Sequence, residues 1–381
     1  MTAGGRWTDA ALDGLRREGD DRARRCLDAL HAEHGTRAAS LVFGTMSAND
    51  DPPPGDAPAA LGEFFADTRD LPAGVDRARL HRGEDVFLTH AFSAALVLLA
   101  KSLPAGYAAP SLALVLNISG DLIRSPYRRL LGVLQMVVNV CASRGFEPGG
   151  RAVVTAQKLR LLHEGVRRIA RRRLPDFEAR YGVPVNHEDM LATILGFSYL
   201  VLMGFRRLGV GLTREAEEDY WYVWRVFAQC MGLDAARLPA DVDDAGAFYA
   251  AYARRHYVPA ARNPDGVALA AANLGMLRGL IPRPLRWLGL GVAPAFYMRE
   301  LLTEEECARV GIPRVHGHRL LRVLLALLTR AGLGPRATDA RERHVHAAIS
   351  RAIFQGMIDR AWHGEVRFRV PATLADLRRL A

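Results

Sequence analysis

The sequence predicts an all-α protein, and three observations support that prediction. Apolar residues recur at helical spacing along most of the 381 residues, which is the signature of amphipathic helices. Some of these segments begin with a capping residue, such as Thr213 before the acidic residues of 215–218, where negative charge favours the helix terminus. Strand patterns are rare and no internal repeat is found, so one large helical domain is the simplest organisation.

The predicted elements follow in order from the N-terminus. Residues 1–60 form an N-terminal part, in which 1–37 has helical spacing and 47–58 collects the Pro, Asp and Gly typical of a surface loop. Residues 61–381 form the main domain. Its helices are predicted at residues 84–103, 112–119, 127–144, 152–173, 187–208, 213–231, 243–257, 285–301, 304–310, 319–330 and 341–362.

Composition excludes several classes of protein. Because 50% of the residues are hydrophobic and 24% are charged, a disordered chain is not expected. The four cysteines are far apart and form no CxxC pair, which argues against a disulfide framework or a zinc ribbon. The N-terminus lacks the apolar core of a secretion signal, so we expect a cytoplasmic protein. The uncharged stretches at 102–120 and 190–205 are interrupted or short, so no membrane span is predicted.

Basic residues are concentrated in one short run. Five arginines occupy residues 167–173, within a chain whose net charge is +10. Such a run binds polyanions in some proteins, but here neither a nucleic-acid motif nor interleaved aromatic residues accompany it. A solvated helix face is the commoner origin of such a run, and we therefore predict no nucleic-acid partner.

The most informative segment is the helix that contains His163. At about 100° per residue, Arg160, His163 and Arg167 fall within about 60° of one another, whereas Leu162, Val166 and Ile169 point the other way. One interpretation is a cationic stripe that faces solvent. The other is a stripe that faces a cavity, where His163 ligates haem iron and the arginines pair with propionates.

Other candidate residues have structural explanations. Asn186 is a candidate N-cap of the helix that begins with His187, which we keep as a second candidate haem ligand. The histidine pairs 316 with 318 and 344 with 346 have spacing that suits metal binding only on extended chain. No dinucleotide, P-loop or nucleophile-elbow motif occurs. The aromatic cluster from Tyr220 to Phe227 is expected to pack in the core, or else to line a substrate pocket.

Several of these segments resemble one known family. The segments are RRLLGV at 128–133, LRLLHEGVR at 159–167, VPVNHEDMLATILGFS at 183–198, YWYVWRVFAQCMGLD at 220–234 and FYMRELLTEEECARVGIP at 296–313. Together they resemble the DUF2236 family, which includes latex-clearing rubber oxygenases and MpaB-type oxygenases. The resemblance implies a helical domain that encloses a haem pocket, globin-like in style.

The resemblance also implies a cofactor and its ligands. A member of this family binds haem b through the His of the H-x-x-V-R segment, here His163, and uses dioxygen to cleave alkene bonds of isoprenoids. The family's Arg and Thr on the preceding helix correspond to Arg129 and Val133, and the Lys of rubber-cleaving members corresponds to Gly132. Arg129, Arg160 and Arg167 are the expected propionate anchors or ordering residues.

The expected partner is a small lipophilic substrate, and the fold also allows peripheral contact with a membrane. The oligomeric state is not predicted. Because the Lys and Thr are replaced, a helical binding protein for haem or another hydrophobic ligand, without oxygen chemistry, is the alternative function.

Overall fold

The computed structural model describes residues 5–34, 46–118 except 54 and 56, and 126–315 except 288, and within these it is entirely helical. The side chains of residues 126–129 and 131 are not described. The predicted helices at 319–330 and 341–362, and the four histidines of the two pairs, lie outside the described residues. The all-α prediction is therefore confirmed for the part of the chain that the structure describes.

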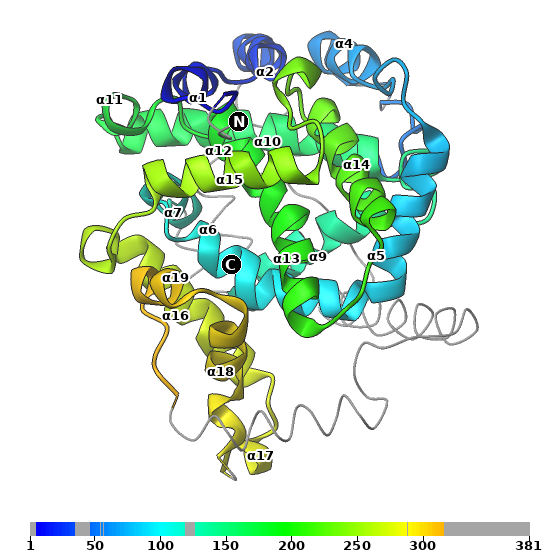
Figure 1. Cartoon of the computed structure of the whole chain (residues 1–381). Coiled ribbons are helices and arrows are strands. Elements are labelled where there is room, and N and C mark those ends of the chain that lie inside the picture. The colour runs from blue at the N-terminus through cyan, green and yellow to red at the C-terminus, as the bar shows by residue number, and fades with distance from the viewer. Residues whose placement is uncertain are drawn as a thin grey trace.

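Figure 1 shows the helices stacked around a central group of long helices. The α-helices are α1 (Asp9–Arg16), α2 (Asp21–His34), α4 (Ala59–Asp67), α5 (Arg77–Val97), α6 (Leu103–Gly106), α7 (Pro110–Asn117), α9 (Pro126–Cys141), α10 (Ala152–Arg173), α11 (Phe177–Tyr181), α12 (His187–Phe197), α13 (Tyr199–Leu208), α14 (Arg214–Cys230), α15 (Val242–His256), α16 (Pro264–Gly279), α17 (Arg283–Trp287), α18 (Ala293–Leu301) and α19 (Glu304–Val310). Short 3₁₀ turns lie at Ala235–Arg237, Ala260–Arg262 and Leu290–Val292, and a π-helix at Leu98–Ser102.

Helices α5 and α14 pack along much of their length, and a glycine lets their backbones approach closely. A Cβ atom at Gly83 would lie only 2.1 Å from the backbone oxygen of Asp219. The buried Asp219 carboxylate also accepts hydrogen bonds from Arg79 and Arg82 on α5, at 2.9 and 2.6 Å. Backbone contact and paired charge therefore fix these two helices together.

Two hydrophobic clusters stabilise the fold. The larger one spans most helices from α1 to α19, and it includes the aromatic residues of α14. The prediction that these aromatic residues pack in the core is confirmed, because Tyr220, Trp221, Trp224 and Phe227 are all buried. A smaller cluster joins α2 and α4 to one side of α10, through residues such as Leu30, Phe65 and Leu161.

One predicted helix is broken in the structure. Residues 187–208 form two helices, α12 and α13, which meet at the buried Ser198 with φ −113° and ψ −82°. The Ser198 hydroxyl donates to the Ile194 carbonyl at 2.9 Å, which satisfies a backbone acceptor at the break. The predicted cap is confirmed, because the Asn186 side chain accepts a hydrogen bond from the Asp189 backbone N–H at 2.8 Å.

Two segments have the length and composition of membrane spans, namely Arg77–Gly106 and His187–Leu208. Each contains an 18-residue apolar window, of which 61% and 72%, respectively, is buried inside the protein. Core helices of a folded domain pass the same test of length and composition.

Candidate functional site

Helix α10 carries the predicted haem ligand, and its charged face is the buried one. Arg160 and Arg167 are both buried, with exposures of 7% and 1%. His163 lies between them along the helix and is half-buried. Of the two interpretations of this stripe, the one in which it faces solvent is therefore wrong for the two arginines.

The buried arginines are held by groups of the protein itself. Arg160 binds the carboxylate of Asp20 through two hydrogen bonds, at 2.5 Å from Nε and 3.0 Å from Nη2. Burial raises the pKa of Asp20, but the hydrogen bond and charge of Arg160 outweigh it, so the net pKa is lowered. Asp20 thus remains ionised and neutralises a guanidinium that would otherwise be very costly to bury.

Arg167 has a comparable set of partners. It donates to the carbonyls of Pro184 and Val185 at 3.1 and 2.7 Å, and it forms an ion pair with Glu164 at 3.3 Å. Burial lowers the pKa of the guanidinium, which Glu164 partly offsets. Both guanidinium groups are therefore engaged by groups inside the protein, and the role of Arg160 and Arg167 as propionate anchors stays a prediction.

The opposite face of α10 is apolar and only partly covered. Leu159, Leu162, Val166 and Ile169 are all half-buried, and they share the side of the helix next to His163. Leu162 packs against the cluster formed with α2 and α4, and Leu159 packs against the main core. Around His163, helix α10 therefore buries two arginines and leaves these four apolar side chains half-buried, although Leu161 and Ala170 of the same helix are buried and its last three arginines are exposed.

Helix α9 lies beside α10, and it carries the other predicted site residues. The Asn139 side chain of α9 donates to the Thr155 hydroxyl of α10 at 3.1 Å, which links the two helices near the end of α9 and the start of α10. A Cβ atom at Gly132 would meet no described atom within 4 Å, so there is space at this position. Val133 is half-buried.

The third predicted arginine, Arg129, lies on the first turns of α9, one helical turn before Gly132. Its backbone belongs to the helix, but its side chain lies outside the described residues. The predicted roles of Arg129, Gly132 and Val133 stay predictions.

His187, the second candidate ligand, belongs to the buried charged face. It starts α12, is 8% exposed, and its Nδ1 lies 3.3 Å from a Glu18 carboxylate oxygen. Burial lowers the pKa of this histidine, which favours the neutral ring. Arg167 contributes to the same electrostatic environment, so His187 lies on the charged side of α10 and not on the apolar side.

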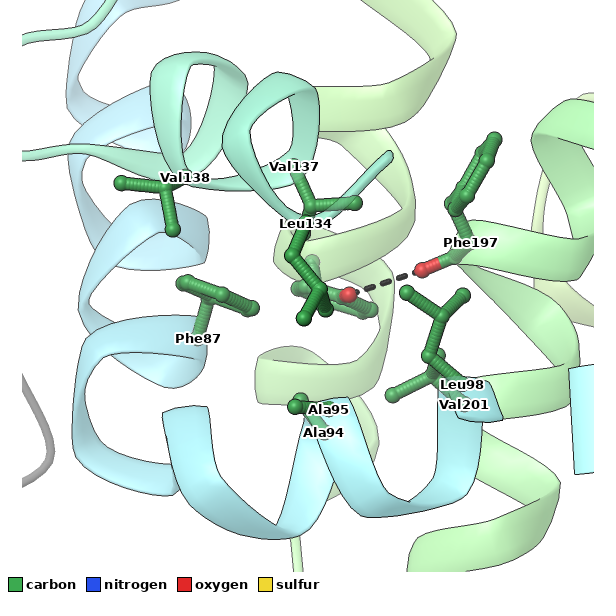
Figure 2. A pocket seen from close by; sticks show the side chains of 10 residues that line it. Phe87, Ala94, Ala95, Leu98, Leu134, Val137, Val138, Phe197 and Val201 are labelled. Carbon is green, nitrogen blue, oxygen red and sulfur yellow. Dashed lines mark hydrogen bonds between the residues drawn. The ribbon is translucent and has the colours of Figure 1, made fainter. Parts of the chain in front are cut away.

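A small apolar pocket lies on the other side of α9. Figure 2 shows it between α5, α9, α13 and α14, with Phe87, Leu98, Leu134 and Val201 among its lining residues. Tyr220 contributes the polar group, and its hydroxyl donates to the Phe197 carbonyl at 2.8 Å. Of the lining residues, the sequence had indicated only Tyr220, because the rest resemble ordinary core positions.

Among the described residues, no three His, Cys, Asp or Glu side chains gather in the geometry of a metal site. His163 does not line the pocket of Figure 2. The cavity between the pocket's side chains is about 10 Å³, room for at most about one water molecule, and therefore far smaller than a ligand pocket.

Taken together, the fold and the site define a helical protein with an imidazole beside an accessible apolar helix face. Comparison with known proteins gives the family. The family described as the catalytic domain of the ER-bound oxygenase mpaB/B′ and rubber oxygenase matches residues 78–361. The chain belongs to this family, as the resemblance of its motifs predicted.

Two individual proteins are similar to this chain. The rubber oxygenase of Streptomyces sp. (strain K30) is 24% identical over 279 residues, which cover 70% of this chain and 66% of that relative, just under two thirds of its length. A solved structure of latex clearing protein LCP in the closed state has a TM-score of 0.73 and 22% sequence identity, covering 90% of this chain and 91% of that one. At this identity the structural similarity shows that the fold is shared.

Proposed function

We propose that the protein is a haem b-dependent oxygenase that acts with dioxygen on a small lipophilic substrate, isoprenoid-like or another natural product. Oxidative cleavage of a C=C bond is the proposed reaction. Membership of a family of oxygenase catalytic domains supports the reaction class. The proposed cofactor rests on one observation: His163 is half-buried beside the accessible apolar face of α10.

The residues present fit a haem in two respects. Imidazole is a common axial ligand of haem iron, and His163 provides one. The half-buried Leu159, Val166 and Ile169 provide hydrocarbon of the kind that packs on a porphyrin and excludes water from it. Of the three predicted anchoring arginines, the proposal keeps only Arg129, because Arg160 and Arg167 have protein partners.

In this proposal each residue has a defined task. Bound haem supplies the redox-active iron that activates dioxygen. His163 holds the cofactor, while the apolar face of α10 keeps water away from it. Gly132 and Val133 contribute no titratable group, so neither residue donates or accepts a proton in the reaction. A lipophilic substrate suits such surroundings because its burial requires no polar partner.

An absorption spectrum tests the cofactor. The purified chain supplied with hemin should develop a Soret band, and His163→Ala should abolish or strongly shift it. Imidazole added to His163→Ala should restore part of the band, which separates a lost ligand from a lost fold. His187→Ala is the matched control and should keep the spectrum of the parent. A colourless parent protein, or loss of the band only in His187→Ala, contradicts the proposal.

Oxygen consumption tests the reaction. The haem-loaded protein should consume dioxygen only when a lipophilic alkene is present. A specific observation favours the alternative, a non-catalytic haem or hydrophobic-ligand binding protein. Gly132 and Val133 stand where the resemblance expects Lys and Thr, and space remains beside Gly132. Tight hemin binding without oxygen uptake across a panel of lipophilic alkenes would favour this binding protein.

A further inference from the structure

Exposed hydrophobic side chains gather in one short segment, residues 278–292, which we name the tip segment. Five large hydrophobic side chains are exposed among the described residues, and four of them lie in this segment. Their exposures are 49% for Leu280, 41% for Leu285, 93% for Trp287 and 43% for Val292. The fifth, Phe92 on α5, is 57% exposed and lies far away in the sequence. Such clustering is unusual, because exposed apolar residues are normally scattered singly.

The tip segment is also purely basic. It contains Arg278, Arg283 and Arg286, and no acidic residue occurs between Asp265 and Glu300. Arg278 and Arg283 are exposed and Arg286 is half-exposed. A Cβ atom added to Gly291 would lie 3.9 Å from the side chains of both Arg278 and Arg286, so these two side chains approach the same point. Apolar surface and positive charge therefore share one surface, and among the described residues no acidic side chain pairs with these three arginines.

The position of the tip segment suits a flat partner. Helix α16 leads out of the body of the protein and α18 returns to it, and Figure 1 shows α17 at the lower end of the molecule, opposite α1, α2 and α4. Pro282 and Pro284 keep α17 short, at Arg283–Trp287. The exposed side chains are therefore presented at an extremity of the described part of the protein, where none of the labelled helices of Figure 1 lies beyond α17.

We infer that the tip segment docks on the surface of a lipid bilayer that carries anionic headgroups. Tryptophan is enriched at the level of the headgroups, where its ring is partly in hydrocarbon and its N–H meets polar groups. Leucine and valine side chains favour the hydrocarbon just below, and arginine pairs with lipid phosphate. The tip segment combines all three kinds of residue without an opposing negative charge.

The same features argue against the other two occupants. In a symmetric dimer this surface would meet its own copy, and three arginines would face three arginines without a carboxylate to neutralise them. A nucleic acid would match the charge, but it would leave Leu280, Leu285 and Val292 without an apolar partner. An anionic bilayer satisfies both the charge and the hydrocarbon.

Vesicle co-sedimentation of the full chain tests this inference. We expect the protein to sediment with vesicles of phosphatidylcholine containing phosphatidylglycerol, and much less with phosphatidylcholine alone. Arg283→Glu combined with Arg286→Glu should reduce the bound fraction strongly, since each arginine near an anionic surface contributes about fivefold in affinity. Trp287→Ala should also reduce binding, and the emission of Trp287 should shift to the blue in the parent protein.

Matched controls separate this site from general effects. Phe92→Ala removes another exposed aromatic residue, and Arg172→Glu reverses another exposed arginine, so both variants should bind vesicles like the parent. The inference would be overturned if these two controls lost as much vesicle binding as the tip-segment variants. It would also be overturned if the parent bound neutral vesicles as well as anionic ones. A change of oligomeric state in Trp287→Ala without vesicles, or preferential binding of the parent to a nucleic-acid duplex, would overturn it as well. Because no step requires haem, the result is independent of the proposed function.

Discussion

Replacing Arg160 by methionine should destabilise the protein even when no porphyrin is present. This prediction separates the structural role of Arg160 from the propionate role that the sequence suggested. The side chains of Arg160 and Asp20 are only 8% and 5% exposed, and they meet in a bidentate ion pair. Methionine fills much of the same volume, so the main change is that Asp20 loses its counter-charge.

The expected loss follows from this burial. Removing one partner of a buried ion pair costs about 3–5 kcal/mol of unfolding free energy, because the remaining charge has lost its compensation. Asp20→Asn should cost a similar amount. The double variant Arg160→Met with Asp20→Leu should lose less than the sum of the single changes, with a coupling energy of about 1–3 kcal/mol.

Urea unfolding of the haem-free proteins, followed by circular dichroism, measures these free energies. Hemin titration of the same variants supplies the second measurement, and hemin affinity should change little wherever the fold persists. Two results would refute the reasoning. One is a haem-free Arg160→Met whose stability stays within about 0.5 kcal/mol of the parent. The other is a hemin affinity that falls in Arg160→Met but not in Asp20→Asn.

Three further predictions concern helix contact, pH and capping. Gly83→Ala should cost about 1–3 kcal/mol in thermal unfolding, because its Cβ would lie 2.1 Å from the Asp219 oxygen. A Cβ atom added at Gly132 has no described atom within 4 Å, so Gly132→Ala should be neutral or should stabilise the protein by up to about 1 kcal/mol. Equal losses of unfolding free energy in Gly83→Ala and Gly132→Ala would refute the packing argument. Burial raises the pKa of Glu84 from 4.5 to about 7, so its contribution to stability is complete below pH 4.5 and falls as the pH rises to 7. Stability measured across this interval should drop by about 3 kcal/mol more in the parent than in Glu84→Gln, and parallel curves would contradict the assignment. Asn186→Ala should lose about 1 kcal/mol of unfolding free energy, and Asn186→Ser should lose much less because serine also caps helices. Equal losses in the two variants would mean that the cap is not the cause.

Local patterns in the sequence predicted many helices well. Helix α10 begins and ends at the predicted residues 152 and 173, and α19 matches its predicted range of 304–310. The break at Ser198 was not predicted, although Gly196 lies two residues before it and Gly with Ser is a combination at which helices kink. The π-helix at Leu98–Ser102 was also missed, although the following Pro104 lacks the N–H that a regular helix would use.

Helix α16 was not predicted, and its composition explains why. It contains many small and apolar residues on all sides, so it has no hydrophobic stripe that stands out in the sequence. Its start does carry a local signal. The Asn263 side chain accepts from the Gly266 backbone N–H at 3.0 Å, and Pro264 occupies the first turn. A search for capping residues before a proline would have found this helix.

The candidate site shows a different limit of sequence analysis. Spacing along α10 correctly places Arg160 and Arg167 on one side of the helix and Val166 on another. It does not reveal which side faces the protein, because that depends on Asp20, 140 residues earlier in the chain. Long-range pairing of this kind has no local signature, and so neither of the two interpretations of this stripe, facing solvent or facing a cavity, anticipated the protein partners of its arginines.

The half-covered apolar side of α10 next to His163 is itself an argument for a ligand. A helix that lies on a protein surface gains stability by burying its apolar side. Here the protein buries Leu161 and Ala170 of α10, but it also buries Arg160 and Arg167, which require Asp20, Glu164 and backbone carbonyls as partners. It leaves the side of α10 that contains Val166 only half-covered, so the described part of the protein does not gain the full hydrophobic contribution there. An apolar ligand held beside His163 would supply that contribution, and a buried charged face gives α10 the rigid support that a precise ligand position requires.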